Sequence, residues 1–121
     1  MSNVDALAAR VRALKERVDE ADGYARACRA ALARLRGPLG TLSTVSVDVG
    51  GLRSRSAKVD RARSQAESAR EVVGTARSRL ADAAGDLGRI AGRYERQADM
   101  ARADLRAARK QLAAAMASGV G

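Results

Sequence analysis

The sequence is poor in the side chains that build large cores and most active sites. It has no tryptophan, phenylalanine or histidine, and its two aromatic residues are Tyr24 and Tyr94. The absence of histidine excludes serine–histidine and cysteine–histidine catalytic pairs and any imidazole metal ligand. Cys28 is the only cysteine, which excludes a disulfide within the chain and a cysteine-based zinc site. We therefore expect no enzyme activity, no metal, no cofactor and no small-molecule ligand.

Long apolar runs are also missing. No stretch approaches the roughly 20 apolar residues that a membrane span requires. The first residues include Asp5 and lack the apolar run of a secretory signal peptide. We expect a protein without a membrane span that lies in the cytoplasm, or that is exported without a cleaved signal peptide.

Basic residues exceed acidic ones, by 23 to 14, which gives a net charge of +9. Such a balance is typical of nucleic-acid-binding proteins. However, the basic residues are spread along the chain, and the sequence has no base-reading motif and no interleaved aromatics for stacking. Arginine and alanine are abundant together, as a GC-rich coding sequence would produce. A basic nucleic-acid-associated protein is therefore the less favoured alternative.

Alanine dominates the apolar residues, which make up 46% of the chain. Alanine is the best helix former because it loses no side-chain entropy. It is also a poor core filler, since apolar burial stabilises by only about 25 cal/mol per Å² and alanine offers little area. The chain should form helix easily and gain little by folding on itself, so we expect a second chain to supply part of the burial.

A heptad repeat predicts a first helix over residues 4–36. Ser2 or Asn3 can cap its N-terminus. Apolar residues recur at alternating spacings of three and four, the pattern of a helix that packs on another helix. The two rows are Val4, Val11, Val18, Ala25 and Leu32, and Leu7, Leu14, Ala21, Cys28 and Leu35.

A corner is predicted over residues 37–51. Gly37 is expected to stop the first helix and Pro38 to prevent its restart. The corner is longer than the 2–8 residues usual between packed helices, and its "TVSVDVGG" segment alternates like a strand. Either its apolar side chains fold over the end of the hairpin as a lid, or they form an edge that a partner recognises.

The heptad returns over residues 52–117. Its rows are Leu52, Val59, Ala66, Val73, Leu80, Leu87 and Tyr94, and Ala62, Ala69, Ala76, Ala83 and Ile90. After Ile90 the spacing becomes four and four, which is a stutter. Either one helix runs through the glycines at 85–92 with a kink, or Gly85 ends a second helix and a third folds back. The unbroken heptad phase from Leu80 to Leu87 favours the continuous helix.

Two short motifs accompany this pattern. "LRGP" (Leu35, Gly37 and Pro38) occupies the predicted corner, and "RYERQAD" places Asp99 five residues after Tyr94. Together with the two long helices, they resemble the small W-x-G helical-hairpin proteins of actinobacterial type VII secretion, with leucine in place of tryptophan. The resemblance implies a heterodimer with another helical chain or with a toxin N-terminal domain, and it makes Tyr94 and Asp99 a candidate export signal.

These observations predict a single all-α domain over residues 1–121, an elongated antiparallel helical hairpin with coiled-coil packing. The predicted function is helix-mediated protein–protein association, as a type VII secretion-type partner. The alternative is a homodimeric coiled-coil scaffold. The predicted partner interface consists of Val4, Leu7, Val11, Leu14, Val18, Leu32, Leu35, Leu52, Val59, Val73, Leu80, Leu87 and Ile90.

Overall fold

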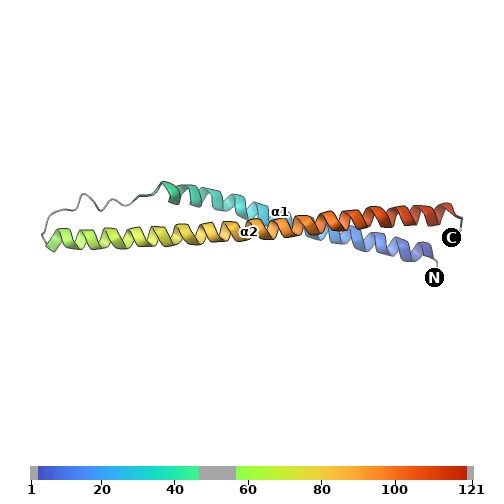
Figure 1. Ribbon diagram of the computed structural model, residues 1–121, viewed down its shortest axis with the longest axis horizontal. Helices are drawn as coiled ribbons and strands as arrows, with labels where there is room; N and C mark the ends of the chain where they lie inside the picture. The colour runs from blue at the N-terminus through green and yellow to red at the C-terminus, as the bar shows by residue number, and fades with distance from the viewer. Residues whose placement is uncertain (1–2, 47–56, 120–121) are drawn as a thin grey trace. The chain divides into compact units, whose positions relative to one another are not determined.

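The fold consists of two helices. The computed structural model describes residues 3–46 and 57–119, in which α1 spans Asn3–Thr44 and α2 spans Ala57–Ala117 (Figure 1). These described ranges contain no strand. The helices pack against each other within the units described below, so the predicted all-α helical hairpin is confirmed.

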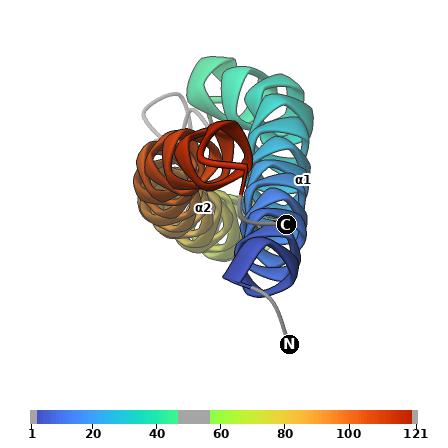
Figure 2. The ribbon, with the colours of Figure 1, turned by 90° about the vertical axis from the view of Figure 1, so that its right-hand side faces the viewer.

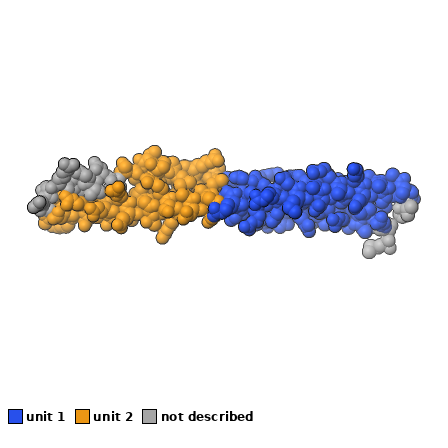
Figure 3. All heavy atoms as spheres, viewed as in Figure 1, with its two compact units in different colours: residues 1–30, 88–121 blue, residues 31–87 orange. Residues whose placement is uncertain are grey.

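The chain forms two compact units, which are coloured separately in Figure 3. Unit 1 combines Met1–Ala30 with Gly88–Gly121, and unit 2 is Ala31–Leu87. In unit 1 the N-terminal part of α1 lies beside the C-terminal part of α2, as Figures 1 and 2 both show. Unit 2 contains the end of α1 and the first half of α2.

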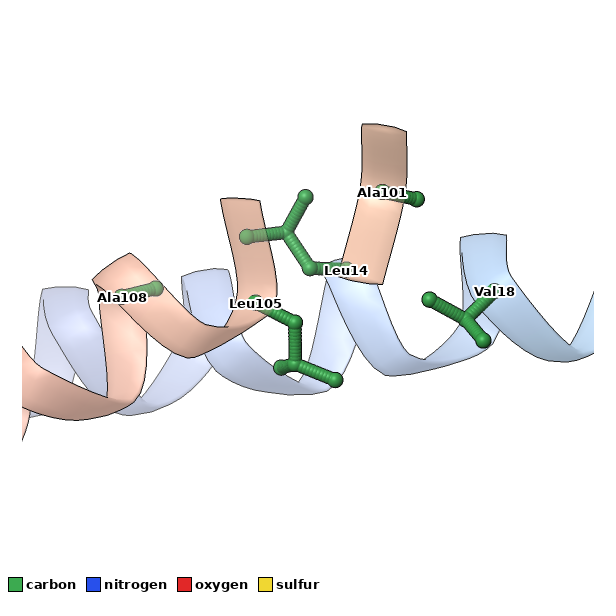
Figure 4. Close-up of a cluster of buried hydrophobic side chains, with 5 residues drawn as sticks. All are labelled: Leu14, Val18, Ala101, Leu105 and Ala108. Atoms are coloured by element: carbon green, nitrogen blue, oxygen red, sulfur yellow. The ribbon is translucent and has the colours of Figure 1, made fainter. Parts of the chain in front are cut away.

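The core of unit 1 is narrow and lined by alanine. Leu14 and Val18 of α1 pack with Ala101, Leu105 and Ala108 of α2 (Figure 4). Figure 4 shows the two leucine side chains lying between the helices, with the alanines along α2. Small residues on one helix let the backbones approach, and the larger residues opposite them fill the space that remains. Two helices alone therefore bury these side chains to 8% exposure or less.

Helix α1 does not end at Gly37, as the sequence predicted, but continues to Thr44 with Pro38 inside it. Proline in a helix interior removes one backbone hydrogen bond and costs about 3 kcal/mol. Leu39 and Leu42 are half-buried and extend the three-and-four spacing beyond Leu35, so their burial offsets that cost. The corner predicted over residues 37–51 is therefore wrong in its first eight positions.

Helix α2 is continuous through the glycine-rich segment. This confirms the continuous helix that the heptad phase favoured, and the alternative fold-back at Gly85 does not occur. The predicted start at Leu52 lies outside the described residues. The predicted stutter begins before Ile90 rather than after it. The packing face passes from Leu87 to Ala91, four residues later, since Ala91 is fully buried whereas Ile90 is 37% exposed. The glycines are not required for close helix approach at Gly88, where an added Cβ would meet nothing within 4 Å.

Candidate protein–protein interface

The predicted interface residues divide sharply between the two units. In unit 1, Leu14 and Val18 are buried inside the hairpin itself. Three further predicted interface residues of unit 1 are half-buried, namely Val4, Leu7 and Val11. The predicted interface residues of unit 2 are also half-buried, namely Leu32, Leu35, Val59, Val73, Leu80 and Leu87. Ile90 points out of the core, and Leu52 lies outside the described residues. The prediction therefore identified the packing face of both helices, but in unit 1 the chain covers that face itself.

Unit 2 has a packing face that its own two helices do not close. All nine buried apolar residues of the described chain lie in unit 1. In unit 2 even the leucines that face the other helix stay half-buried. We name this face the unit 2 seam and define it as Leu32, Leu35, Leu39, Leu42, Val59, Val73, Leu80 and Leu87. The leucines that α1 contributes to this face are all half-buried, so the face stays partly accessible.

A groove of about 580 Å³ runs beside the unit 2 seam on α2. Its lining residues are Glu71, Val72, Thr75, Ala76, Arg79 and Leu80. Val72 is 68% exposed. Among the described residues α1 contributes nothing to this lining, so the groove is a free face of one helix rather than a closed ligand cavity.

The C-terminus of α1 is held by an arginine of α2. The Arg77 guanidinium donates hydrogen bonds to the carbonyl oxygens of Leu42 and Val45, the latter at 3.1 Å. The last carbonyls of a helix lack intrahelical partners and carry partial negative charge, so a cation there is favourable. Thr41, Ser43 and Thr44 donate their hydroxyls back to carbonyls of the preceding turn. Arg77 thus fixes where α1 ends within unit 2.

The two readings of the corner are tested only in part. Val47 and Val49, on which the strand-like alternation depends, lie outside the described residues. Leu39 and Leu42 belong to α1 and pack within unit 2. Val45 is exposed and lines a small pocket of about 300 Å³ with Arg70 and Val73.

An arginine–glutamate pair joins the helices of unit 1. The Arg29 guanidinium contacts both carboxylate oxygens of Glu95, with Nη2 to Oε1 at 2.6 Å and Nε to Oε2 at 3.4 Å. This two-pronged geometry is specific to arginine and carboxylate. The hydrogen bond from Arg29 lowers the pKa of Glu95, and the same bond raises the pKa of Arg29. Both side chains are about half exposed, so the pair mainly sets the register of the helices.

A second ion pair follows along the same side of unit 1. Arg102 of α2 pairs with Asp22 of α1 and also with Asp99, one turn earlier on its own helix, at 3.0 Å. The hydrogen bond to Asp22 is the main cause of the raised pKa of Arg102. Asp22 is the more buried of the two carboxylates, so the contact between helices is the better shielded one.

The two tyrosines meet in unit 1. The rings of Tyr24 and Tyr94 lie 5.0 Å apart between centroids and are tilted by 35°, an offset geometry that aromatic pairs favour. Arg17, Glu20, Ala21 and Gln97 surround them in a pocket of about 530 Å³. Of the candidate export signal, Tyr94 therefore faces α1, whereas Asp99 is 76% exposed and is held by Arg102.

These polar contacts were not among the features predicted from the sequence, although a signal for them exists. Asp22, Arg29 and Glu95 each directly follow a residue of the packing rows, and Arg102 directly follows the buried Ala101. Such flanking positions carry the ion pairs between helices in coiled coils. Their opposite charges could have predicted both the pairs and the antiparallel register.

No group of three potential metal ligands occurs among residues 3–46 and 57–119. Within the same ranges no helix is both long enough and apolar enough to cross a membrane. Comparison with known proteins finds no matching family model, no matching curated protein and no matching solved structure.

Proposed function

We propose that this protein is a helix-mediated interaction module, and that a second helical chain packs on the unit 2 seam. The observation that carries the proposal is the contrast between the units. Unit 1 buries nine apolar residues, whereas the described part of unit 2 buries none despite its row of leucines. A leucine gains about 1.5–3 kcal/mol when it becomes fully buried, so covering this seam supplies a driving force for association.

The accessible surface of the chain supports this reading. It amounts to 8807 Å², whereas a folded monomer of this mass exposes about 6,200 Å². The difference of about 2,600 Å² lies slightly above the roughly 1,000–2,500 Å² that each partner loses in a large, permanent interface. The chain thus exposes more surface than a compact monomer of its mass, which leaves area that a partner can cover.

In its most specific form, the proposal is a type VII secretion-type partner that pairs with an unlike helical chain or with a toxin N-terminal domain. The support is the resemblance of the two-helix architecture and of the "RYERQAD" segment, in which Asp99 is accessible to export machinery. Leu35, Gly37 and Pro38 lie within α1 rather than at the turn. The proposal therefore rests on the helices and the unit 2 seam rather than on a corner motif.

Mass measurement by light scattering tests the proposal. The full chain is purified alone and then mixed in equal amounts with the helical product of an adjacent gene. A secretion partner should form a one-to-one complex. A doubled mass of the chain alone would instead favour the homodimeric scaffold. If the measured mass is that of a single chain in both samples at 10 µM, the proposal that a second chain packs on the unit 2 seam is contradicted.

Two variants locate the interface. Leu80→Asp places a charge in the unit 2 seam, and we expect at least a tenfold weaker complex, because the carboxylate would lose its hydration on burial. Ala81→Asp introduces the same group one residue later, at an exposed position, and should change affinity less than twofold. Circular dichroism of each free variant verifies that the helices persist. Equal weakening by both variants would mean that the interface lies elsewhere.

A further inference from the structure

Charge is distributed unevenly within unit 1. Residues 16–30 and 88–104 together carry seven basic and seven acidic side chains. Residues 6–15 of α1 and 105–119 of α2 carry six basic side chains and no acidic one. We name these two spans the basic end. They lie side by side, because Val11 and Leu14 pack with Leu105 and Ala108.

The ion pairs of unit 1 form a regular ladder that leads to this end. On α1, the second ion pair uses Asp22, which lies seven residues before Arg29 of the first pair. On α2, the second pair uses Arg102, which lies seven residues after Glu95 of the first pair. Both pairs therefore belong to one antiparallel register, repeated after two helical turns on the same side of the hairpin.

The next position of this register holds a cation on both helices. Another seven residues along each helix lead to Lys15 and Arg109. Arg12 and Arg106 lie one turn from them, three residues earlier on each helix, and so share their face. Of the six cations of the basic end, none forms an ion pair with the described residues. The six are Arg10, Arg12, Lys15, Arg106, Arg109 and Lys110.

We infer that the basic end is a docking surface for an acidic segment of a protein partner, whose carboxylates take the place of the missing anion between Lys15 and Arg109. Like charges that face each other destabilise the free chain, and a carboxylate placed between them would relieve that repulsion. This inference goes beyond the proposed function, because it concerns a surface of unit 1 that the unit 2 seam does not include.

The size of the basic end favours an acidic peptide over a nucleic acid. It is limited to three helical turns of α1 and the last turns of α2, and the neighbouring part of unit 1 is electrically balanced. A duplex or a single strand is usually bound along an extended basic track, with aromatics for stacking in the case of a single strand. Tyr24 and Tyr94 lie outside the basic end and pack on each other.

One substitution separates binding from folding. Arg109→Glu places a carboxylate opposite Lys15 and completes the ladder as a third ion pair. The melting temperature of the full chain should therefore rise by a few degrees, while binding of an acidic peptide should weaken at least tenfold. Arg93→Glu makes the same charge change on the same helix, at an exposed position in the balanced part of unit 1, and should change binding less than twofold.

The binding probe is a fluorescent 12-residue peptide with six glutamates, measured by anisotropy in 50 mM salt. A single-stranded DNA with the same number of negative charges is measured beside it. The inference predicts that the peptide binds more tightly than the DNA and that only Arg109→Glu disrupts its binding. Absence of peptide binding, equal losses in the two variants, or tighter binding of the DNA would each overturn it.

Discussion

At the scale of single residues, Leu14 tests the core of unit 1. It is 4% exposed and packs against the alanine-lined face of α2. Leu14→Ala should lower the free energy of unfolding by about 2–4 kcal/mol, because it removes burial and leaves a cavity. Urea denaturation measures the change. Val72→Ala removes an apolar side chain that is 68% exposed and should cost less than about 0.5 kcal/mol; similar losses in the two variants would place the core elsewhere.

Glu95 gives unit 1 a pH-dependent contribution to stability. The hydrogen bond from Arg29 lowers its pKa from the ordinary value of 4.5. A carboxylate with a lowered pKa in the folded state stabilises the fold above its unfolded pKa, and this contribution is lost as the pH falls through the folded value. The wild-type chain should therefore be more stable than Glu95→Gln at pH 7. This difference should begin to shrink as the pH falls below the ordinary value of 4.5 and should vanish below the lowered pKa of Glu95.

Unfolding by urea at a series of pH values measures this difference. High salt should reduce it at pH 7, because both side chains are about half exposed and exposed charges are screened. Glu67→Gln serves as the matched control for loss of a carboxylate, since Glu67 is exposed and forms no ion pair with the described residues. A gap between wild type and Glu95→Gln that stays constant from pH 7 to pH 3 would show that the pair does not form.

At the scale of the elements, Pro38 tests the extent of α1. The helix continues through it to Thr44, so the carbonyl of Arg34 lacks its backbone partner. Pro38→Ala restores this hydrogen bond and should stabilise the chain by about 1–3 kcal/mol. Thermal melting followed by circular dichroism measures the gain. A helix that ended at Gly37 would gain nothing from this substitution, because residue 38 would then lie outside it.

The end of α1 shows how far local sequence signals reach. Gly37 and Pro38 are strong stop signals, and they led to the wrong boundary. The three-and-four spacing through Leu32, Leu35, Leu39 and Leu42 was the better guide, because burial along a packed face outweighs the cost of one proline. Arg77, which holds the last carbonyls of α1 from another helix, could not be predicted from residues near the corner.

The packing face itself was largely predictable, because heptad spacing determines which side of each helix is apolar. Ile90 was misplaced, because both Ile90 and Ala91 are apolar and only the register decides which of them faces α1. Charges beside the packing rows could have predicted Asp22–Arg102 and Arg29–Glu95. The accessibility of the unit 2 seam could not be predicted, since heptad spacing shows which face of a helix packs but not how completely the other helix covers it.

At the scale of the whole molecule, the chain has one unit whose packing face its own helices bury and, in our proposal, one unit whose packing face a partner covers. Unit 1 has a core, two ion pairs between helices and a tyrosine pair. The described part of unit 2 has half-buried leucines and a helix end held by Arg77. Alanine makes this division possible, because it forms helix at every position but fills a core only where the helices approach closely.

Hydrogen exchange, measured on samples whose mass is determined in parallel, tests this claim most directly. Backbone amides of a segment exchange slowly only when packing keeps its hydrogen bonds closed. The account predicts that residues 31–46 and 57–87 are protected only in samples that contain an assembly, whereas residues 3–30 and 88–119 are protected in the single chain as well. A single chain at nanomolar concentration in which both units are equally protected would contradict the account.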